Sequence, residues 1–508
     1  MYNHSENQLL LPGDFFLPFG GSLNPYNRWV HLAQLIPWGQ AESMYKQKLK
    51  DVTQGAHAYS VRMALGALVI KERLGTSDQE TVQQIAENPY LQYFLGLAEY
   101  QETCPFDVSS LTYFRRRIDA DMIAQVNEWV VEAASSSSDE EDPPDDDHGG
   151  PSANSQEGRD QDAAPSDRPQ YHQGKLLMDT TCTPADIAYP TDLKLLNNAR
   201  EKLEAIIDTM HEERPDGSVK PRTYRNKARK QYLAVAKKRR PGAKKRRSAI
   251  RQQLHHVRRD LDHVAALAEE TTLMPLSTKQ YRDLLVIQEL YRQQQTMFVS
   301  KRRRIDHRIV SIAQPHVRPM VRGKAHAAVE FGAKMSVVVT NGWTHLDRLE
   351  WDAYHDAEDL PRAVEAYYDR HGHYPEAVLA DQLYRTRENR RFCQERKIRL
   401  SGPKLGRPSK ETKEAANHQA YQDACERNAV EGKFGEGKRS YGLGRIQARR
   451  QDTSETVISL QILNLNLAKA LRDLPAWCVV ILRKRMKDSR SMMFPFQQLF
   501  LFKKPVIQ

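Results

Sequence analysis

The chain has few cysteines and no long apolar run. Its five cysteines are scattered without any Cys-x2-Cys pair (Cys104, Cys182, Cys393, Cys425 and Cys478). This spacing predicts neither a disulfide framework nor a thiolate zinc site. The longest apolar stretch, "WCVVILRK" at 477–484, is far shorter than the roughly 20 residues that span a membrane. The N-terminus also lacks the basic start and apolar run of a signal peptide. We therefore expect a cytoplasmic protein with no membrane partner.

Positively charged residues outnumber negatively charged ones. The 508 residues include 76 Lys or Arg against 65 Asp or Glu, a formal net charge of +11. This excess favours a polyanion as partner and carries no information about the fold. A chain of this length is expected to form two or three domains.

An acidic segment almost without apolar residues divides the chain. Of the nine residues 139–147, seven are Asp or Glu. Such a composition cannot bury enough apolar surface to offset chain entropy, so we expect a disordered linker at 133–170. The boundaries that follow are an N-terminal domain at 1–132, a second domain at 171–472 and a C-terminal tail at 473–508.

The N-terminal part is predicted to be helical over 28–132. "AYSVRMALGALVIKERLG" has enough apolar residues for a buried helix, and Gly75 is expected to end it. "VSSLTYFRRRIDADMI" places three arginines on a helix: Arg115, Arg116 and Arg117. Short helices that end in a basic helix are typical of a helix-turn-helix DNA-binding domain. A plain helical bundle with solvated arginines fits this segment equally well.

The second domain has the pattern of an α/β fold. "GKLLMDTTCTPADIAYP" (174–190) predicts two short strands around a turn at Thr183-Pro184. Residues 326–354 predict a β-hairpin that turns at Asn341-Gly342. Two further short strands, "EAVLAD" and "IRLSGP", alternate with helices. We expect a mixed sheet covered by helices.

A helical insertion is predicted at about 193–312, between the first strands and the hairpin. Residues 222–260 hold sixteen Lys or Arg against one Asp. Leucines at helical spacing on its C-terminal side predict two long helices that pack together and carry the basic loop "AKKRRPGAKKRRSA". Charge of one sign repels itself, so we expect DNA phosphate to bind this loop, including Lys244, Lys245, Arg246 and Arg247.

Three carboxylates stand out by their position. Asp179 interrupts an apolar strand, Asp381 ends the apolar strand "AVLAD", and Glu431 lies on the helix after the last strand. A charge in an apolar strand is costly unless it is paired or binds a metal. We expect the three to converge on two Mg²⁺ ions, for which Mn²⁺ can substitute, because hard cations take oxygen ligands and two of them support phosphodiester displacement.

Basic residues flank the third acid. Arg427 lies four residues before Glu431 and Lys438 seven after it. Both would share its helix face and hold DNA phosphates, unless Gly435 and Gly437 end the helix first. A simple surface ion pair is the alternative role for Glu431. Four other acids compete for this role: Asp186, Asp192, Asp347 and Asp352. Of these, Asp186 and Asp192 are expected to be loop or cap residues.

Three blocks resemble the acidic motifs of DDE transposases from bacterial insertion sequences, in the group of the fifth insertion-sequence family. They are "LMDTTCTPADIAYPTD", "VLADQLYRTRENRRFCQERKIRLSGPKLGRP" and "RNAVEGKFGEGKRSYGLGRI". "FFLPFGGSLNPYNRWVHLAQLIPW" and "RMALGALVIKERLG…QIAENPYLQYFLG" are similar to the N-terminal domain of the same proteins. The resemblance covers about 14–472 without the linker.

The resemblance implies a ribonuclease-H-like catalytic domain with Asp179, Asp381 and Glu431 as the metal-binding triad. In related transposases the third acid lies in a Tyr-x2-Arg-x3-Glu-x6-Lys pattern. Arg427, Glu431 and Lys438 match it, but the Tyr position is Ala424. Tyr421, one turn earlier, is a candidate substitute.

The implied activity is hydrolysis at the ends of a mobile element, followed by attack of the freed 3′-hydroxyl on target DNA. Its partners would be double-stranded DNA, as terminal inverted repeats and target, and a second copy of the chain in a DNA-bound homodimer. Its place would be the bacterial cytoplasm, with the nucleoid. The alternatives are a domesticated, catalytically inactive transposase that only binds DNA and a structure-specific nuclease on the same fold.

Overall fold

A computed structural model of the chain describes residues 11–18, 20–49, 57–135, 172–214, 218–321, 329–403 and 410–488, with no side-chain description at 410–413, at 415–416 or beyond 473. The predicted linker at 133–170 lies outside these residues, apart from 133–135, which end a helix. The boundary predicted at 472 is not an element boundary, because the last helix continues to Asp488. Among the described helices, none has the length and apolar character needed to cross a bilayer.

The N-terminal part consists of short helices, as predicted. They are α1 (Arg28–Leu35), α2 (Trp38–Gln47), α3 (Val61–Leu74), α4 (Asp78–Glu87), α5 (Pro89–Phe94), α6 (Ser110–Arg117) and α7 (Ala120–Ser135). Gly75 ends α3 with a φ of 67°, a left-handed conformation that suits glycine. The Ser77 side chain then accepts a hydrogen bond from the Glu80 amide at 3.1 Å and so caps α4.

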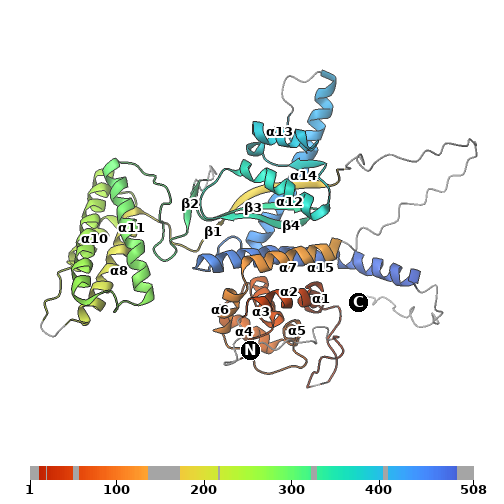
Figure 1. Ribbon diagram of the computed structural model, residues 1–508, viewed down its shortest axis with the longest axis horizontal. Helices are drawn as coiled ribbons and strands as arrows, with labels where there is room; N and C mark the ends of the chain where they lie inside the picture. The colour runs from red at the N-terminus through yellow and green to blue at the C-terminus, as the bar shows by residue number, and fades with distance from the viewer. Residues whose placement is uncertain are drawn as a thin grey trace, which may run out of the picture.

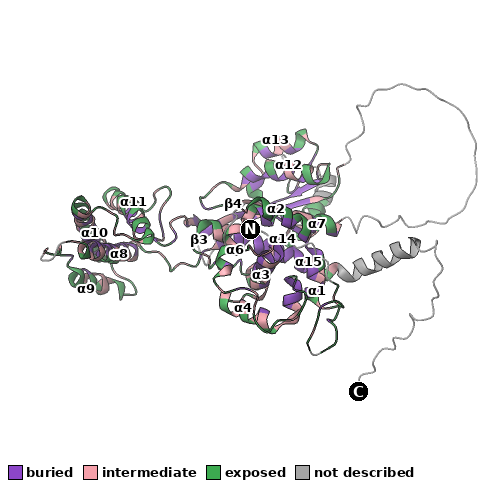
Figure 2. Cartoon of the chain, turned by 60° about the horizontal axis from the view of Figure 1, so that its bottom comes forward, coloured by how far each residue is buried: buried purple, intermediate pink, exposed green. Residues whose placement is uncertain are grey.

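The hydrophobic core of these helices is completed by the last helix of the chain, α15 (Gln451–Asp488). Leu460, Leu463 and Leu467 of α15 are fully buried in the same cluster as Leu65 of α3 and Val126 of α7. Figure 2 shows the buried faces of α3, α7 and α15 turned toward one another. The chain boundary predicted near residue 132 therefore does not divide the hydrophobic core.

The second part contains one mixed sheet, which confirms the predicted α/β class. Its strands are β1 (Lys175–Pro184), β2 (Arg318–Val321), β3 (Val329–Thr340), β4 (Trp343–Glu350), β5 (Ala377–Leu379) and β6 (Arg399–Leu400). Strand β1 lies between β3, which is antiparallel to it, and β5, which is parallel to it. The other edge of β3 pairs first with β2 and then with β4, and β6 extends the sheet beyond β5 in parallel.

The prediction of two strands with a turn at Thr183-Pro184 was wrong. β1 is a single ten-residue strand that pairs with β3 up to Pro184, opposite Gly332. A Cβ atom at Gly332 would lie 2.0 Å from the Thr183 carbonyl oxygen, so only glycine allows this approach. The pairing involves residues about 150 positions away, and the local turn signal of Thr-Pro could not reveal it.

The hairpin prediction is confirmed. β3 and β4 are joined by Asn341 and Gly342, with φ values of 51° and 79°. Positive φ at both central residues defines a type I′ turn. Asn-Gly favours this turn, and its twist matches that of the flanking strands. Trp343 and Trp351, at the ends of β4, are 7% and 6% exposed and belong to hydrophobic clusters, so both serve core packing.

Helices cover both faces of the sheet (Figure 1). One face packs against α12 (Asp359–His371) and α13 (Arg387–Glu395), which follow the short 3-10 turns η1 (Asp356–Glu358) and η2 (Gln382–Tyr384). The other face packs against α14 (Lys410–Ser440) and the first part of α15. Leu177 of β1, Leu379 of β5 and Val430 of α14 share this second cluster.

The insertion forms a helical bundle that stands apart from the rest of the molecule (Figure 1). Its helices are α8 (Asp192–Glu212), α9 (Arg225–Ala236), α10 (Ala243–Thr271) and α11 (Thr278–Ser300). α10 and α11 pack together as predicted, but α8 shares their core. The basic stretch lies between α9 and α10 rather than between the two long helices, and its second half forms the first turns of α10.

Candidate catalytic carboxylates and nucleic-acid interface

Asp179 and Asp381 lie at neighbouring positions, just beyond the point where the parallel pairing of β1 with β5 ends. The parallel pairing of β1 and β5 runs from Lys175 opposite Ala377 to Leu177 opposite Leu379. Asp179 and Asp381 each lie two residues after the last pair, Leu177 and Leu379. Since side chains alternate between faces, both carboxylates lie on the face of Leu177 and Leu379. Two acids far apart in sequence are therefore neighbours in register.

Local hydrogen bonds hold each carboxylate. Asp179 Oδ1 accepts a hydrogen bond from the Thr180 amide at 2.8 Å. Asp381 Oδ1 accepts one from the Gln382 amide at 2.6 Å, and so caps the turn η2. Both side chains remain partly accessible to solvent. The two groups are fixed in direction but can still reach a ligand.

Helix α14 carries Glu431 along this face. The helix continues to Ser440, so Gly435 and Gly437 do not break it and Lys438 lies three turns beyond Arg427 on the same side. The buried side chain of Val430 packs in the cluster of Leu177 and Leu379, which sets the position of α14 over the sheet. The adjacent residue, Glu431, is exposed.

The two basic companions of Glu431 contact the aspartate region. Arg427 forms an ion pair with Asp381, with 3.5 Å between Nη1 and Oδ1. Lys438 donates a hydrogen bond from Nζ to Thr181 Oγ1 at 2.9 Å. Thr181 lies two residues after Asp179 and on the same face of β1. Glu431 therefore lies between two side chains that reach the ends of β5 and β1.

The carboxylates do not form a closed metal site by themselves. Within the part of the chain that the structure describes, no group of three or more His, Cys, Asp or Glu side chains is arranged to hold a metal ion. The donor set nevertheless fits Mg²⁺, which takes oxygen ligands and commonly uses only one or two protein carboxylates. Asp179 and Asp381 supply that number from adjacent strands.

A neutral tyrosine lies behind the aspartates. Tyr384 follows Asp381 through η2 and is 1% exposed. Burial, together with the nearby carboxylates of Asp356 and Asp179, raises the pKa of Tyr384 well above its usual range. Its phenol therefore stays protonated and adds no charge to the site.

The competing acids each have a structural partner. Asp186 pairs with Arg445 at 2.6 Å, beyond the end of β1. The other three form ion pairs elsewhere: Asp192 with Arg308, Asp347 with Arg362 and Asp352 with Arg318. Asp186 lies in the loop after β1 and Asp192 begins α8, as expected, whereas Asp347 lies within β4.

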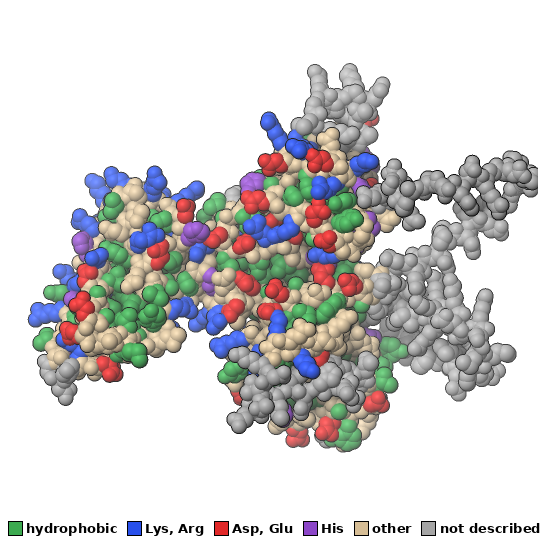
Figure 3. Space-filling view, in the orientation of Figure 1, with side chains coloured by type: hydrophobic (Ala, Val, Ile, Leu, Met, Phe, Trp, Pro, Cys, Tyr) green, Lys and Arg blue, Asp and Glu red, His purple; other side chains and the backbone are tan. Residues whose placement is uncertain are grey.

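The predicted basic residues of the insertion gather at one end of the bundle. Lys244, Lys245, Arg246 and Arg247 are all exposed on the first turns of α10. Arg247 also donates to the Phe298 carbonyl at 3.1 Å, near the end of α11. This contact brings the exposed run 301–304, "KRRR", to the same end, which the sequence analysis did not single out. Figure 3 shows Lys and Arg side chains crowded over the upper end of the bundle.

The three arginines of α6 differ in their surroundings. Arg115 forms two hydrogen bonds with the carboxylate of Asp78 at 3.0 and 2.5 Å, which ties α6 to α4. Arg117 is half-buried, whereas Arg116 is exposed. Of the three, Arg116 is the one whose charge faces solvent most fully.

Comparisons with known proteins match both parts of the chain. Residues 378–468 match a family model described as a transposase DDE domain, and residues 19–117 match one described as a transposase domain, DUF772. The first match includes Asp381 and Glu431 but begins after Asp179. A Rhizobium meliloti protein described as uncharacterized protein ORF8 in nfe locus is 28% identical over 181 residues, 36% of this chain and 73% of that protein. No solved structure matches the chain.

Proposed function

We propose that this chain, which matches two transposase family models, is a DDE transposase of an insertion sequence. It would bind the terminal inverted repeats of the element, cut at its ends and join them to target DNA. The observation that carries this proposal is the register of β1 and β5, which makes Asp179 and Asp381 neighbours on one face of the sheet. Helix α14 adds Glu431 over the same face.

The three carboxylates have one role in this proposal. Asp179, Asp381 and Glu431 would hold two Mg²⁺ ions, or Mn²⁺ in their place. When bound, the ions supply a lowered pKa for an attacking water and stabilise charge on the leaving oxygen. The ion pair of Arg427 with Asp381 would then be replaced by a contact with DNA phosphate, because the metal neutralises the carboxylate. Lys438 would hold phosphate from the other side of Glu431.

The proposed reaction is two phosphoryl transfers. In the first, the oxygen of a water molecule bonds to the phosphorus at the element's end, and the bond from that phosphorus to the 3′-oxygen breaks, which leaves a 3′-hydroxyl. In the second, that 3′-oxygen bonds to a phosphorus of the target and displaces the target's own 3′-oxygen. In each step the attacking oxygen loses its proton to solvent, and the leaving 3′-oxygen takes up a proton from solvent. No protein atom bonds to phosphorus, so the chain needs no nucleophilic side chain.

The remaining parts would hold DNA. The N-terminal helices, with Arg116 exposed on α6, would read the inverted repeats, and the basic end of the bundle would hold flanking DNA. A sheet whose central strand β1 is antiparallel to β3 and parallel to β5 and is flanked by helices supports a ribonuclease-H-like domain. Because two ends must be cut together, we propose a homodimer on DNA, acting in the bacterial cytoplasm with the nucleoid.

Strand transfer by the purified protein tests the proposal. The assay combines inverted-repeat DNA, a target plasmid and Mg²⁺, with an Asp179→Asn variant as the inactive control. Joined products with the native protein are expected. Cleavage without joining would indicate a structure-specific nuclease, and binding without cleavage would indicate an inactive domesticated protein. Omission of Mg²⁺ should stop both steps and leave DNA binding.

A further inference from the structure

Three surface hollows meet at a single arginine. The first has a volume of about 610 Å³. It lies between the N-terminal helices α3, α4 and α6 and the segment 440–450, which joins α14 to α15. The second, of about 470 Å³, lies beside Pro315 and His316. The third, of about 530 Å³, lies between α8 and the segment 310–314. Arg449 lines all three hollows, which extend from the N-terminal helices to the bundle and are together called the Arg449 groove.

Core packing and hydrogen bonds fix the segment 440–450, which forms the floor of this groove. Leu443 and Ile446, within the segment 440–450, are buried in the core of the sheet. The Ile446 amide donates to the Pro184 carbonyl at 2.8 Å, and its carbonyl accepts from the Asp186 amide at 2.9 Å. Ser454 Oγ donates to the Arg450 carbonyl at 2.7 Å and so fixes the start of α15. Arg449 is therefore presented from a rigid segment.

The groove has an excess of uncompensated positive charge. Arg445 and Arg450 are neutralised by Asp186 and Asp452. Four other cations line the groove and form no ion pair with any carboxylate of the described residues: Arg116 in the first hollow, Arg449 in all three, Arg282 in the second and Lys194 in the third. Figure 3 shows Lys and Arg side chains gathered between the bundle and the N-terminal helices, near the start of α15 that Figure 1 displays.

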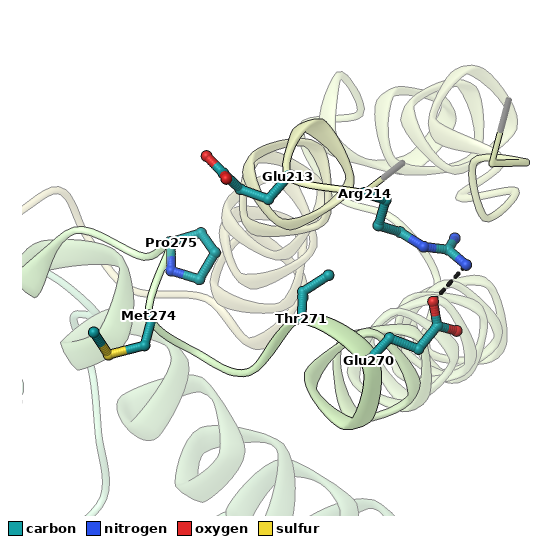
Figure 4. A pocket seen from close by; sticks show the side chains of 6 residues that line it. All are labelled: Glu213, Arg214, Glu270, Thr271, Met274 and Pro275. Carbon is teal, nitrogen blue, oxygen red and sulfur yellow. Dashed lines mark ion pairs between the residues drawn. The ribbon is translucent and has the colours of Figure 1, made fainter. Parts of the chain in front are cut away.

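A hollow at the opposite end of the bundle provides a contrast. It is lined by Glu213, Arg214 and Glu270 together with Thr271, Met274 and Pro275 (Figure 4). Arg214 pairs with Glu270 at 2.5 Å, which leaves Glu213 and a net negative charge. A polyanion would be repelled there. Excess positive charge is thus not common to every hollow on the bundle, although the hollow lined by Arg222 and Lys227 shares it.

We propose that this groove, lined by Arg116, Arg282, Arg449 and Lys194, binds the phosphodiester backbone of duplex DNA between the N-terminal helices and the bundle. This inference rests on the proposed function. The groove passes the end of β1 at Pro184, five residues after Asp179. At roughly 3.3 Å per strand residue, this is roughly 17 Å from the carboxylate, or about five base pairs of B-DNA. The groove would therefore hold DNA about five base pairs from the bond that is cut.

Salt-dependent DNA binding tests this assignment with matched variants. Arg449→Gln removes the charge at the junction, Arg449→Lys keeps it, and Arg391→Gln is the control. Arg391 is an exposed arginine on α13, on the other face of the sheet, where it pairs with Glu395. Loss of one phosphate contact should lower the slope of log K against log salt by about 0.9. If the variant and the native protein bind equally at 1 M salt, the variant then binds roughly eightfold more weakly at 0.1 M.

The expected result is a lower slope for Arg449→Gln, a near-native slope for Arg449→Lys and no change for Arg391→Gln. Phosphate-ethylation interference should also lose a signal about five base pairs from the cut bond in Arg449→Gln. If Arg449→Gln still binds and cleaves inverted-repeat DNA with an unchanged slope and footprint, the groove does not bind DNA. The proposed function would then remain intact. A native protein that does not bind DNA would overturn both.

Discussion

Asn466 of α15 donates a hydrogen bond from Nδ2 to Oδ1 of Asn127 in α7, at 2.8 Å, in the interior of the protein. The same amide group donates to the Thr344 carbonyl at 2.7 Å, and its Oδ1 accepts from the Thr344 amide at 2.9 Å. One buried side chain thus joins the N-terminal helices, strand β4 and the last helix. The domain that would read DNA and the sheet that carries the aspartates are held in one fixed relation.

We expect Asn466→Ala to destabilise the whole chain. It would leave the Thr344 amide and Oδ1 of Asn127 without partners in the interior, which costs about 1–3 kcal/mol. Urea unfolding followed by circular dichroism should show a lower midpoint with a single transition. Asn226→Ala, at an exposed position of α9, is the control. An unchanged midpoint for Asn466→Ala would show that these hydrogen bonds contribute nothing to stability.

Asp179→Asn should abolish DNA cleavage and leave binding of inverted-repeat DNA within about twofold. Loss of a carboxylate ligand removes several kcal/mol of charge stabilisation, so a rate loss of at least about a hundredfold is expected. Gel-based cleavage and fluorescence anisotropy measure the two properties. Asp186→Asn is the matched control, because Asp186 lies on the same segment but pairs with Arg445. Equal losses of cleavage in both variants would contradict the assignment.

Replacing Lys244, Lys245, Arg246 and Arg247 with Gln should weaken DNA binding without regard to sequence. Each lost phosphate contact lowers the salt slope by about 0.9, so four contacts would lower it by at most roughly 3.6. Glutamine has a helix propensity similar to that of lysine and arginine, so α10 should stay folded. Binding titrations at several salt concentrations measure the slope. A native slope would exclude phosphate contact by this end of the bundle.

Asp260 in the bundle is predicted to make stability depend on pH. It is fully buried, and burial raises its pKa to about 7, although Arg259 beside it acts in the opposite direction. The folded chain therefore binds the proton more tightly than the unfolded chain, whose value is near 3.8. This contribution to stability is complete below about pH 3.8 and is lost as the pH rises through about 7.

Asp260→Asn removes this titration. The free energy of unfolding of the variant, relative to the native chain, should rise with pH between 4 and 7 at a rate of up to about 1.4 kcal/mol per pH unit. Chemical denaturation at several pH values measures the difference. Comparing the two proteins at each pH cancels the contribution of His256, whose pKa burial lowers to about 4 and which has the opposite sign. A difference independent of pH would show that Asp260 is ionised throughout.

Two glycine substitutions should have opposite effects. Gly332→Ala would place a Cβ atom against the backbone of Thr183, so we expect a loss of about 1–3 kcal/mol or more from forced movement of β1. Gly432→Ala has no atom within 4 Å of the new Cβ and lies inside α14, so a gain of roughly 0.5–1 kcal/mol is expected. Thermal unfolding measures both. Stabilisation by both changes would contradict the close pairing of β1 with β3.

Elements with local signals could be predicted from the sequence. The end of α3 at Gly75 and the hairpin turn at Asn341-Gly342 depend on φ angles that these residues favour by themselves. The continuity of β1 past Thr183 could not be predicted, because it depends on Gly332. The role of α15 in the N-terminal core was also missed, since its leucines are equally compatible with any apolar partner.

The candidate site was predictable in part. The apolar strands around Asp179 and Asp381 pointed to a sheet, and their common register became visible once β1 and β5 were paired. The position of Glu431 relative to the aspartates depends on how α14 crosses the sheet, which Val430 determines by packing against both strands. The Arg449 groove had no signal in the sequence, because it is lined by segments from four separate parts of the chain.

The order of the elements along the chain has a consequence for synthesis on the ribosome. β1 is made before both of its neighbours, and β3 follows about 150 residues later. Translation proceeds at roughly 5–20 residues per second, so the apolar residues of β1 stay unpaired for on the order of ten seconds or more. The hydrophobic core of the N-terminal helices is completed later still, because Leu463 and Leu467 follow α7 by more than 300 residues. These helices therefore cannot reach their final packing until α15 has left the ribosome.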